Sequence, residues 1–235
     1  SPESGSPESG QVDARFEYVY IIFLYNIQIM PYYPDINLLF IHIPKTGGRV
    51  LESVISKKHK QTLLSSSINN LLPPPYNKKS LQHQFYTTLY HYRDLCRIDF
   101  DKVKIFSVVR NPYDRIISDL IHERLITRST SADCVYNIIK NKYLYMDNRD
   151  NHNIPQYKFV TDETGKLISN IKIFKTETLN EDNKILNRYL GININIQQNN
   201  INKDYSKFLN RNSINLINTF YHKDFELFNY PIKSA

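Results

Sequence analysis

The stretch LLFIHIPKTGGRVLESVI, residues 38–55, decides the fold of this chain. Residues 38–43 form a short apolar run, which is typical of a buried strand. Residues 44–48 (PKTGG) break that run. Apolar residues then recur at helical spacing, at Val50, Leu51, Val54 and Ile55. The stretch therefore predicts a strand, a tight loop and a helix in succession.

The same succession recurs in residues 103–118, VKIFSVVRNPYDRIIS. Residues 103–109 predict a second buried strand and residues 110–114 a turn, and an amphipathic helix follows. Residues 171–175 (IKIFK) predict a third core strand. Because strands alternate with helices, we predict an α/β fold. It is a three-layer sandwich whose central parallel sheet is covered on both faces.

Capping signals predict further helix boundaries. Thr178, followed three residues later by Glu181, predicts a capping box that opens a helix. Gly191 is a natural end for that helix. Ser213 predicts the start of a last helix, and residues 81–92 predict another one.

Composition divides the chain into a domain and its flanks. Residues 1–10 repeat SPESG twice and are either a flexible linker or a vector-derived remnant. Residues 11–37 form an N-terminal extension whose apolar part, residues 18–30, is too short to span a bilayer. A truncated membrane anchor and a segment packed on the domain both remain open. Residues 61–80 are rich in Ser, Asn and Pro and predict a loop, within a domain that covers residues 38–231.

The first loop has the chemistry of an anion site. Gly47 and Gly48 allow the backbone to approach a ligand closely, and the N–H groups that begin the next helix attract an anion. Lys45 adds a positive charge to this P-loop-like arrangement. The pattern differs from the G-x-x-x-x-G-K-[ST] of nucleotide kinases, because the lysine precedes the glycines. The alternative interpretation is a tight turn with a solvated Lys45.

The second loop offers Arg110 and Ser118. A guanidinium fork and a hydroxyl that converge on one point suit a phosphate, and Arg115 adds charge nearby. The alternative is an ordinary turn in which Asp114 caps the helix and pairs with an arginine. Because the carboxyl ends of parallel strands share one edge of a sheet, both loops together predict one ligand with two separated anionic groups.

FIHIPKTGG at residues 40–48 and VVRNPYDRIIS at residues 108–118 together closely resemble a known family. It comprises the Golgi-type carbohydrate sulfotransferases, such as those of heparan and chondroitin, that use 3'-phosphoadenosine 5'-phosphosulfate (PAPS). Softer matches extend the resemblance over about residues 38–231. They are Gln82–His83 (the QH pair), His152 to Gln156 (H-x-x-PQ), KTETL at 175–179 and YHKDFELFNY at 221–230.

The resemblance implies roles for the matching residues, with adenosine 3',5'-bisphosphate as the product. The 5'-phosphosulfate would be held by Lys45, Thr46, Gly47, Gly48 and Arg49. The 3'-phosphate would be held by Arg110 and Ser118. Arg49 stands where many relatives have Thr or Ser, whose hydroxyl would contact the phosphosulfate. The Arg49 side chain therefore either replaces that hydroxyl contact with a positive charge or points outward.

Transfer of a sulfuryl group to a hydroxyl requires a base, because the pKa of the hydroxyl lies far above 7. His83 is the first candidate, from its place in the QH pair and its basic surroundings. Glu52 is the second candidate, and His91 replaces His83 if the helix register differs. Lys45 and the loop N–H groups would stabilise the charge on the leaving phosphate.

Other polar residues are candidates for binding or structural roles. His152 and Gln156 are predicted to contact the acceptor. Lys203 is either a nucleotide contact or a solvated lysine, and His42 on the first strand is predicted to be structural. The scheme needs no metal ion, and the sequence shows no metal-ligand cluster.

The formal net charge of the 235-residue chain is +7, and residues 40–128 alone carry +8. Such a balance predicts an anionic partner. We expect the partner to be a glycan or another hydroxyl-bearing acceptor, and an anionic polysaccharide would meet both expectations. We do not expect nucleic acid. The competing classes are a P-loop-type nucleotide kinase and a non-enzymatic binder of anionic polysaccharide.

The cellular compartment stays open on the sequence alone. Cys96 and Cys134 permit one disulfide without requiring it. The resemblance implies the Golgi lumen. The absence of N-x-S/T sequons and of a full transmembrane helix argues against that compartment.

Overall fold

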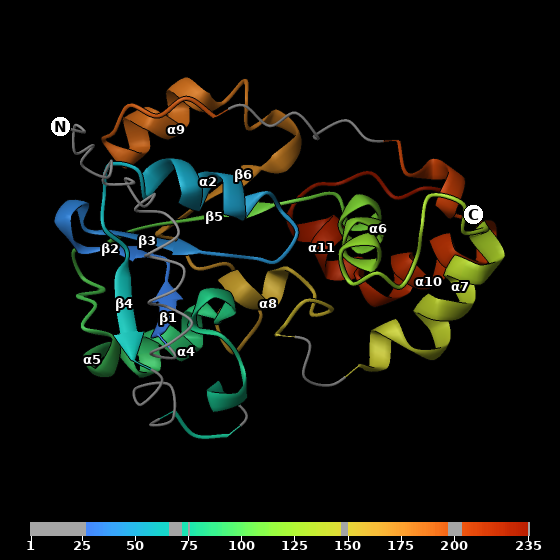
Figure 1. Cartoon of the computed structure of the whole chain (residues 1–235), viewed down its shortest axis with the longest axis horizontal. Helices are drawn as coiled ribbons and strands as arrows, with labels where there is room; N and C mark the ends of the chain where they lie inside the picture. The colour runs from blue at the N-terminus through green and yellow to red at the C-terminus, as the bar shows by residue number, and fades with distance from the viewer. Residues whose placement is uncertain (1–26, 66–71, 75, 147–149, 197–203, 235) are drawn as a thin grey trace, which may run out of the picture.

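The computed structural model describes residues 27–65, 72–74, 76–146, 150–196 and 204–234 (Figure 1). The sequence predictions for residues 1–10, for residues 18–26 and for Lys203 lie outside these residues.

The central sheet contains four strands in the order β2-β3-β5-β6. Its three parallel strands lie where the sequence predicts them: β3 (Leu38–Ile41), β5 (Lys104–Val109) and β6 (Ile171–Lys175). These strands and the helices between them confirm the α/β class.

The sheet is mostly rather than wholly parallel, because β2 (Tyr32–Tyr33) pairs antiparallel with β3 at its edge. The 3-10 turn Pro34–Ile36 and Asn37, which has a left-handed φ of 48°, reverse the chain between the two strands. The strand β2 therefore comes from the segment that the sequence assigns to an extension.

A second, two-stranded sheet pairs β1 (Ile27–Met30) antiparallel with β4 (Thr62–Ser65). The prediction of a loop throughout residues 61–80 is wrong at β4. Its partner strand lies far away in the sequence, so local composition does not reveal the pairing.

α-Helices and short 3-10 turns connect and cover the strands in the described chain. The α-helices are α2 (Gly48–Ile55), α4 (Tyr86–His91), α5 (Arg93–Cys96), α6 (Pro112–His122), α7 (Ala132–Asn141), α8 (Tyr157–Val160), α9 (Asn183–Leu190), α10 (Arg211–Phe220) and α11 (His222–Leu227). Short 3-10 turns occupy Tyr76–Lys78, Leu81–His83, Tyr143–Tyr145, Thr176–Thr178 and Ser206–Phe208.

Helices cover both faces of the central sheet (Figure 1). The side chains of Phe40 and Phe106 enter one apolar cluster, which includes residues of α2 and α9. Their neighbours Leu39 and Ile105 enter the other cluster, which includes residues of α4, α6, α8, α10 and α11. This alternation follows from the period of two along a strand, and burial on both faces explains the continuous apolar runs.

Two predicted helix starts are wrong by a few residues. The hydroxyl of Thr178 donates to Asp182 (2.5 Å) and does not cap a helix, so α9 begins at Asn183. Its predicted end at Gly191, which has a left-handed φ of 74°, is confirmed. The helix α10 is capped by Asn210, and Ser213 is the third-residue partner in that capping box.

The predicted helix over residues 81–92 is interrupted. Residues 81–83 form a 3-10 turn, Gln84 and Phe85 are extended, and α4 begins only at Tyr86. The amide of Gln84 donates to backbone carbonyls of Tyr76 and Lys79, which holds this break. The break separates His83 from the helix.

Both cysteine thiols are free: Cys96 is buried and Cys134 is exposed. Among the described residues, none of the helices combines the length and apolar character needed to cross a membrane.

Candidate active site

The loop between β3 and α2, which we call the lysine loop (residues 43–47), has every carbonyl engaged. Two of these carbonyls accept from groups nearby in the sequence: Ile43 from the hydroxyl of Thr46 (2.8 Å) and Gly47 from the N–H of Val50 (3.1 Å). The other three accept from distant side chains: Pro44 from Arg115 (3.0 Å), Lys45 from Arg110 (3.2 Å) and Thr46 from the hydroxyl of Thr176 (2.7 Å). The backbone is therefore fixed from several distant segments.

Several N–H groups of the lysine loop and of the first turn of α2 are not engaged in this way. No acceptor within the described residues meets the backbone N–H of Lys45, Thr46, Gly48 or Arg49. Lys45 (φ 68°) and Gly47 (φ 87°) both adopt the left-handed region, which curls the loop. Curled backbone with available N–H groups at a helix start suits an anion.

Glycine is required at position 48 for steric reasons. A Cβ there would lie 2.3 Å from the ring of His42. The first residue of α2, directly after the lysine loop, is thus packed against an imidazole. Burial lowers the pKa of the half-buried Lys45 amine. The negative charge of Asp119 acts to raise this pKa, whereas the positive charges of Arg49 and Arg110 lower it further.

Arg110 follows β5 and lies beside the lysine loop. Its guanidinium donates to the Lys45 carbonyl and lies over the ring of Tyr205, 5.7 Å from the centroid. Asn111 caps α6 by accepting from the N–H of Tyr113 (3.0 Å). The structure therefore brings the two sequence motifs together at one edge of the sheet, as predicted.

Gln156 fixes the backbone of Arg110. Its side-chain amide accepts from the Arg110 N–H and donates to the Arg110 carbonyl, both at 2.8 Å. The side chain of Gln156 is fully buried, which favours this structural role over the predicted acceptor contact. The acceptor contact itself stays a prediction.

Asp224 in turn holds the Gln156 segment. Its buried carboxylate accepts from the N–H groups of Gln156 and Tyr157, both at 2.8 Å. Burial raises the pKa of Asp224 to about 6, although those backbone hydrogen bonds act in the opposite direction.

Arg115 has a role that the sequence pattern does not indicate. It is buried, and its guanidinium donates to the carbonyls of Pro44 (3.0 Å), Ile154 (2.9 Å) and His152 (2.8 Å). Instead of adding charge beside a ligand, it ties the lysine loop to the His152 segment. Nothing in the local spacing signals three carbonyls so far away in sequence.

The other residues predicted to hold nucleotide are less constrained. Arg49 is exposed on the first turn of α2, and Ser118 is half-buried on α6. Neither side chain has a hydrogen-bond partner within the part of the chain that the structure describes. Their assignments stay predictions.

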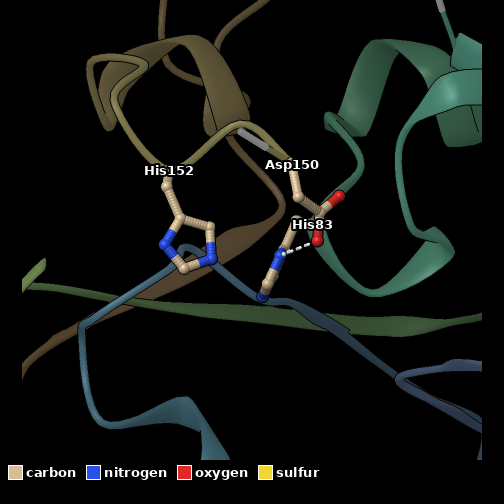
Figure 2. Close-up of side chains that lie close together, drawn as sticks. All are labelled: His83, Asp150 and His152. Carbon is tan, nitrogen blue, oxygen red and sulfur yellow. Dashed lines mark hydrogen bonds and ion pairs between the residues drawn. The ribbon is translucent and has the colours of Figure 1, made fainter. Parts of the chain in front are cut away.

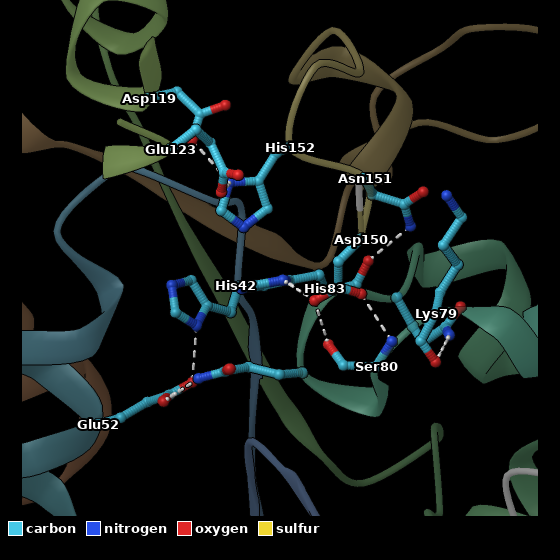
Figure 3. Close-up of polar contacts among 12 residues, drawn as sticks. His42, Glu52, Lys79, Ser80, His83, Asp119, Glu123, Asp150, Asn151 and His152 are labelled. Atoms are coloured by element: carbon cyan, nitrogen blue, oxygen red, sulfur yellow. Dashed lines mark hydrogen bonds and ion pairs between the residues drawn. The ribbon is translucent and has the colours of Figure 1, made fainter. Parts of the chain in front are cut away.

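Three imidazoles lie side by side next to the lysine loop, and we call them the imidazole row (His42, His83 and His152). The rings of His42 and His83 are 5.0 Å apart between centroids, and those of His83 and His152 are 5.2 Å apart. Each Nδ1 meets a carboxylate: Glu52 at 2.8 Å, Asp150 at 2.6 Å and Asp119 at 2.7 Å respectively (Figures 2 and 3).

Burial lowers the pKa of His83 more than its hydrogen bond to Asp150 raises it. Burial alone would raise the pKa of Asp150, but hydrogen bonds from His83 and Ser80 outweigh it and lower that pKa. Both shifts favour a neutral imidazole beside an ionised carboxylate at neutral pH. With Nδ1 donating to Asp150, the other ring nitrogen of His83 carries a lone pair.

The alternative bases are placed differently. Both oxygens of Glu52 are engaged, one with His42 and the other with the amide of Gln82 (2.5 Å). His91 is exposed on α4, and its ring packs on Tyr92 outside the imidazole row. The geometry therefore favours His83, although its catalytic assignment stays a prediction.

A mostly parallel sheet with an amide-lined basic loop at a strand end is characteristic of proteins that bind a phosphorylated nucleotide. The model of the Sulfotransferase family matches residues 32–231, which is most of the chain. The chain therefore belongs to the Sulfotransferase family, which includes carbohydrate sulfotransferases, and it is a transferase. The family implies PAPS as the sulfuryl donor. Searches of curated proteins and of solved structures gave no significant match.

Proposed function

We propose that this chain transfers the sulfuryl group of PAPS to a hydroxyl of a carbohydrate acceptor, with His83 as the general base. One observation carries the proposal. The His83 ring, which Asp150 orients, is separated only by the His42 ring from the backbone N–H groups that follow the lysine loop. The His42 ring lies against Gly48 on one side and 5.0 Å from the His83 ring on the other.

The donor would bind across the two loops. The 5'-phosphosulfate fits the N–H groups of the lysine loop and the Lys45 amine, because several donors and one cation converge there. Arg110 and Ser118 would hold the 3'-phosphate. As the bond from sulfur to the leaving phosphate oxygen breaks, Lys45 and the loop N–H groups stabilise the charge that grows on that oxygen.

The acceptor side requires one proton transfer. The acceptor oxygen forms its bond to sulfur while its proton moves to the free nitrogen of His83. Asp150 holds the opposite nitrogen of the ring and stabilises the imidazolium that results. Asp150 is itself fixed by the N–H and the hydroxyl of Ser80, at 2.6 Å and 2.7 Å.

The carbohydrate class of the acceptor rests on the resemblance of the two motifs to carbohydrate sulfotransferases. A tyrosine hydroxyl on a protein is the competing acceptor. Chondroitin, desulfated heparin and a tyrosine peptide, each assayed with PAPS, distinguish these possibilities. Turnover of the peptide alone would contradict a carbohydrate acceptor.

The donor class is tested by thermal unfolding with adenosine 3',5'-bisphosphate and, separately, with ATP and Mg²⁺. At 100 times its Kd a ligand stabilises the folded state by about 2.7 kcal/mol. For a chain of this size that raises the Tm by roughly 5 to 10 °C. Stabilisation by the bisphosphate alone is expected, and stabilisation by ATP alone would contradict the proposal.

A further inference from the structure

We propose that His83, Asp150 and His152 form a binding site for a divalent cation of the Zn²⁺ type. Each residue contributes one potential ligand atom, and these atoms all lie within 4.8 Å of one another. Figure 2 shows the three side chains facing one another from two separate segments. Their separation in the sequence explains why no ligand spacing is visible there.

The ring of His152 is oriented by a carboxylate, as the rings of metal-binding histidines commonly are. Its Nδ1 lies 2.7 Å from Asp119, which is fully buried and also accepts from the hydroxyl of Tyr143 at 2.7 Å. A buried carboxylate on one ring nitrogen fixes the tautomer and raises the basicity of the other. That other nitrogen turns toward His83 and Asp150 (Figure 2).

The remaining ligands are also held in advance. His83 is only 8% exposed, and its backbone carbonyl accepts from the amide of Asn151 at 2.8 Å. Two bonds from Ser80 fix Asp150 (Figure 3). Within the described residues, the Nε2 atoms of His83 and His152 have no hydrogen-bond partner. Of these two atoms, the Nε2 of His152 turns toward the Nδ1 of His83 and the carboxylate of Asp150, which lie 2.6 Å apart.

The donor set selects the class of cation. Two imidazole nitrogens and one carboxylate oxygen suit Zn²⁺ or Co²⁺, whereas Mg²⁺ and Ca²⁺ prefer oxygen ligands alone. Zinc binds such atoms at about 2.0 to 2.2 Å. The three ligand atoms, which lie within 4.8 Å of one another, would have to draw closer around the cation.

A bound cation would prevent the transfer reaction. This consequence rests on the proposed function of His83. A bound cation engages His83 and Asp150, so His83 no longer accepts the proton of the acceptor. The proposed site is therefore inhibitory, and the transfer reaction itself still needs no metal.

The test uses the metal-free full chain, without donor or acceptor, titrated with Co²⁺ and followed by its visible absorption. We expect one Co²⁺ per chain, displaced by Zn²⁺ and unaffected by Mg²⁺. His152→Ala should weaken binding by more than about 100-fold, and Asp119→Asn by about 10- to 100-fold through the lost orientation. His222→Ala, at an exposed histidine of α11, should bind as the parent does.

A cooperative thermal unfolding transition at a Tm close to that of the parent shows that a variant is folded, and His152→Gln replaces His152→Ala if it is not. Equal Co²⁺ affinity in the parent and the folded His152 variant would overturn the site, as would the absence of one-to-one binding. Because the spectrum needs no turnover, it stands whether or not the chain proves to be a sulfotransferase.

Discussion

The lysine loop and the imidazole row are held in place by different kinds of bond. In the loop, distant side chains and local groups bind backbone carbonyls, so residues 43–47 keep their shape through their main chain. In the row, each ring depends on one carboxylate side chain. Substitution of His83 should therefore affect chemistry alone, whereas substitutions in the loop should affect binding and stability as well.

The largest effect is expected at the imidazole row. His83→Ala should lower kcat by about 10²- to 10⁴-fold, because the acceptor proton loses its base. The affinity for adenosine 3',5'-bisphosphate, measured by titration calorimetry, should stay within about twofold. His222→Ala is the matched control. Normal turnover by His83→Ala would place the base elsewhere.

The next effect is expected in the lysine loop. Lys45→Asn removes the charge while keeping a residue that tolerates the left-handed backbone at this position. We expect kcat/KM to fall by about 10²- to 10³-fold, together with weaker binding of the bisphosphate. Lys57→Asn, at an exposed lysine beyond α2, is the control. Undiminished nucleotide binding would remove Lys45 from the site.

The contact between the two regions is tested by Gly48→Ala. The added methyl group would meet the His42 ring, and overpacking of this kind costs about 1 to 3 kcal/mol. Urea unfolding measures the loss. Combining the change with His42→Ala should recover part of it, since the obstructing ring is gone. A double variant as unstable as the sum of the two single variants would argue against the contact.

The smallest effect is a change in pH dependence at Asp224. Its pKa of about 6 in the folded protein exceeds the ordinary value of 3.8, so the folded state binds the proton more tightly. This group's stabilisation is complete below about pH 4 and is lost as the pH rises through 6. Asp224→Asn should therefore raise the slope of unfolding free energy against pH between 4 and 6. An unchanged slope would show that Asp224 has an ordinary pKa.

The contrast between the lysine loop and the imidazole row also explains which features the sequence predicts and which it does not. The three parallel strands and the two loops follow from contiguous patterns, because apolar runs and Gly, Pro and Lys signals are local. Asp150 and Asp119 were missed as partners of His83 and His152, since isolated carboxylates in a polar sequence carry no signal of what they face. The strand β4 was missed because its partner, β1, lies far away in the sequence.

Helix starts failed at a finer scale. Thr178 and Ser213 have the right residue type for a cap, but hydrogen bonds to Asp182 and Asn210 decide where each helix begins. Short polar side chains offer several such bonds, and only the three-dimensional arrangement selects one.

The pairing of the Gln156 amide with both backbone groups of Arg110 has a consequence for biosynthesis. Asp224 positions Gln156, and Tyr230 donates to Glu177, which in turn accepts from the N–H of Asn111. Arg110 is thus translated early, but its backbone is fixed by residues that leave the ribosome much later. We therefore expect a nascent chain to hold Arg110 in its final position only after Tyr230 has emerged.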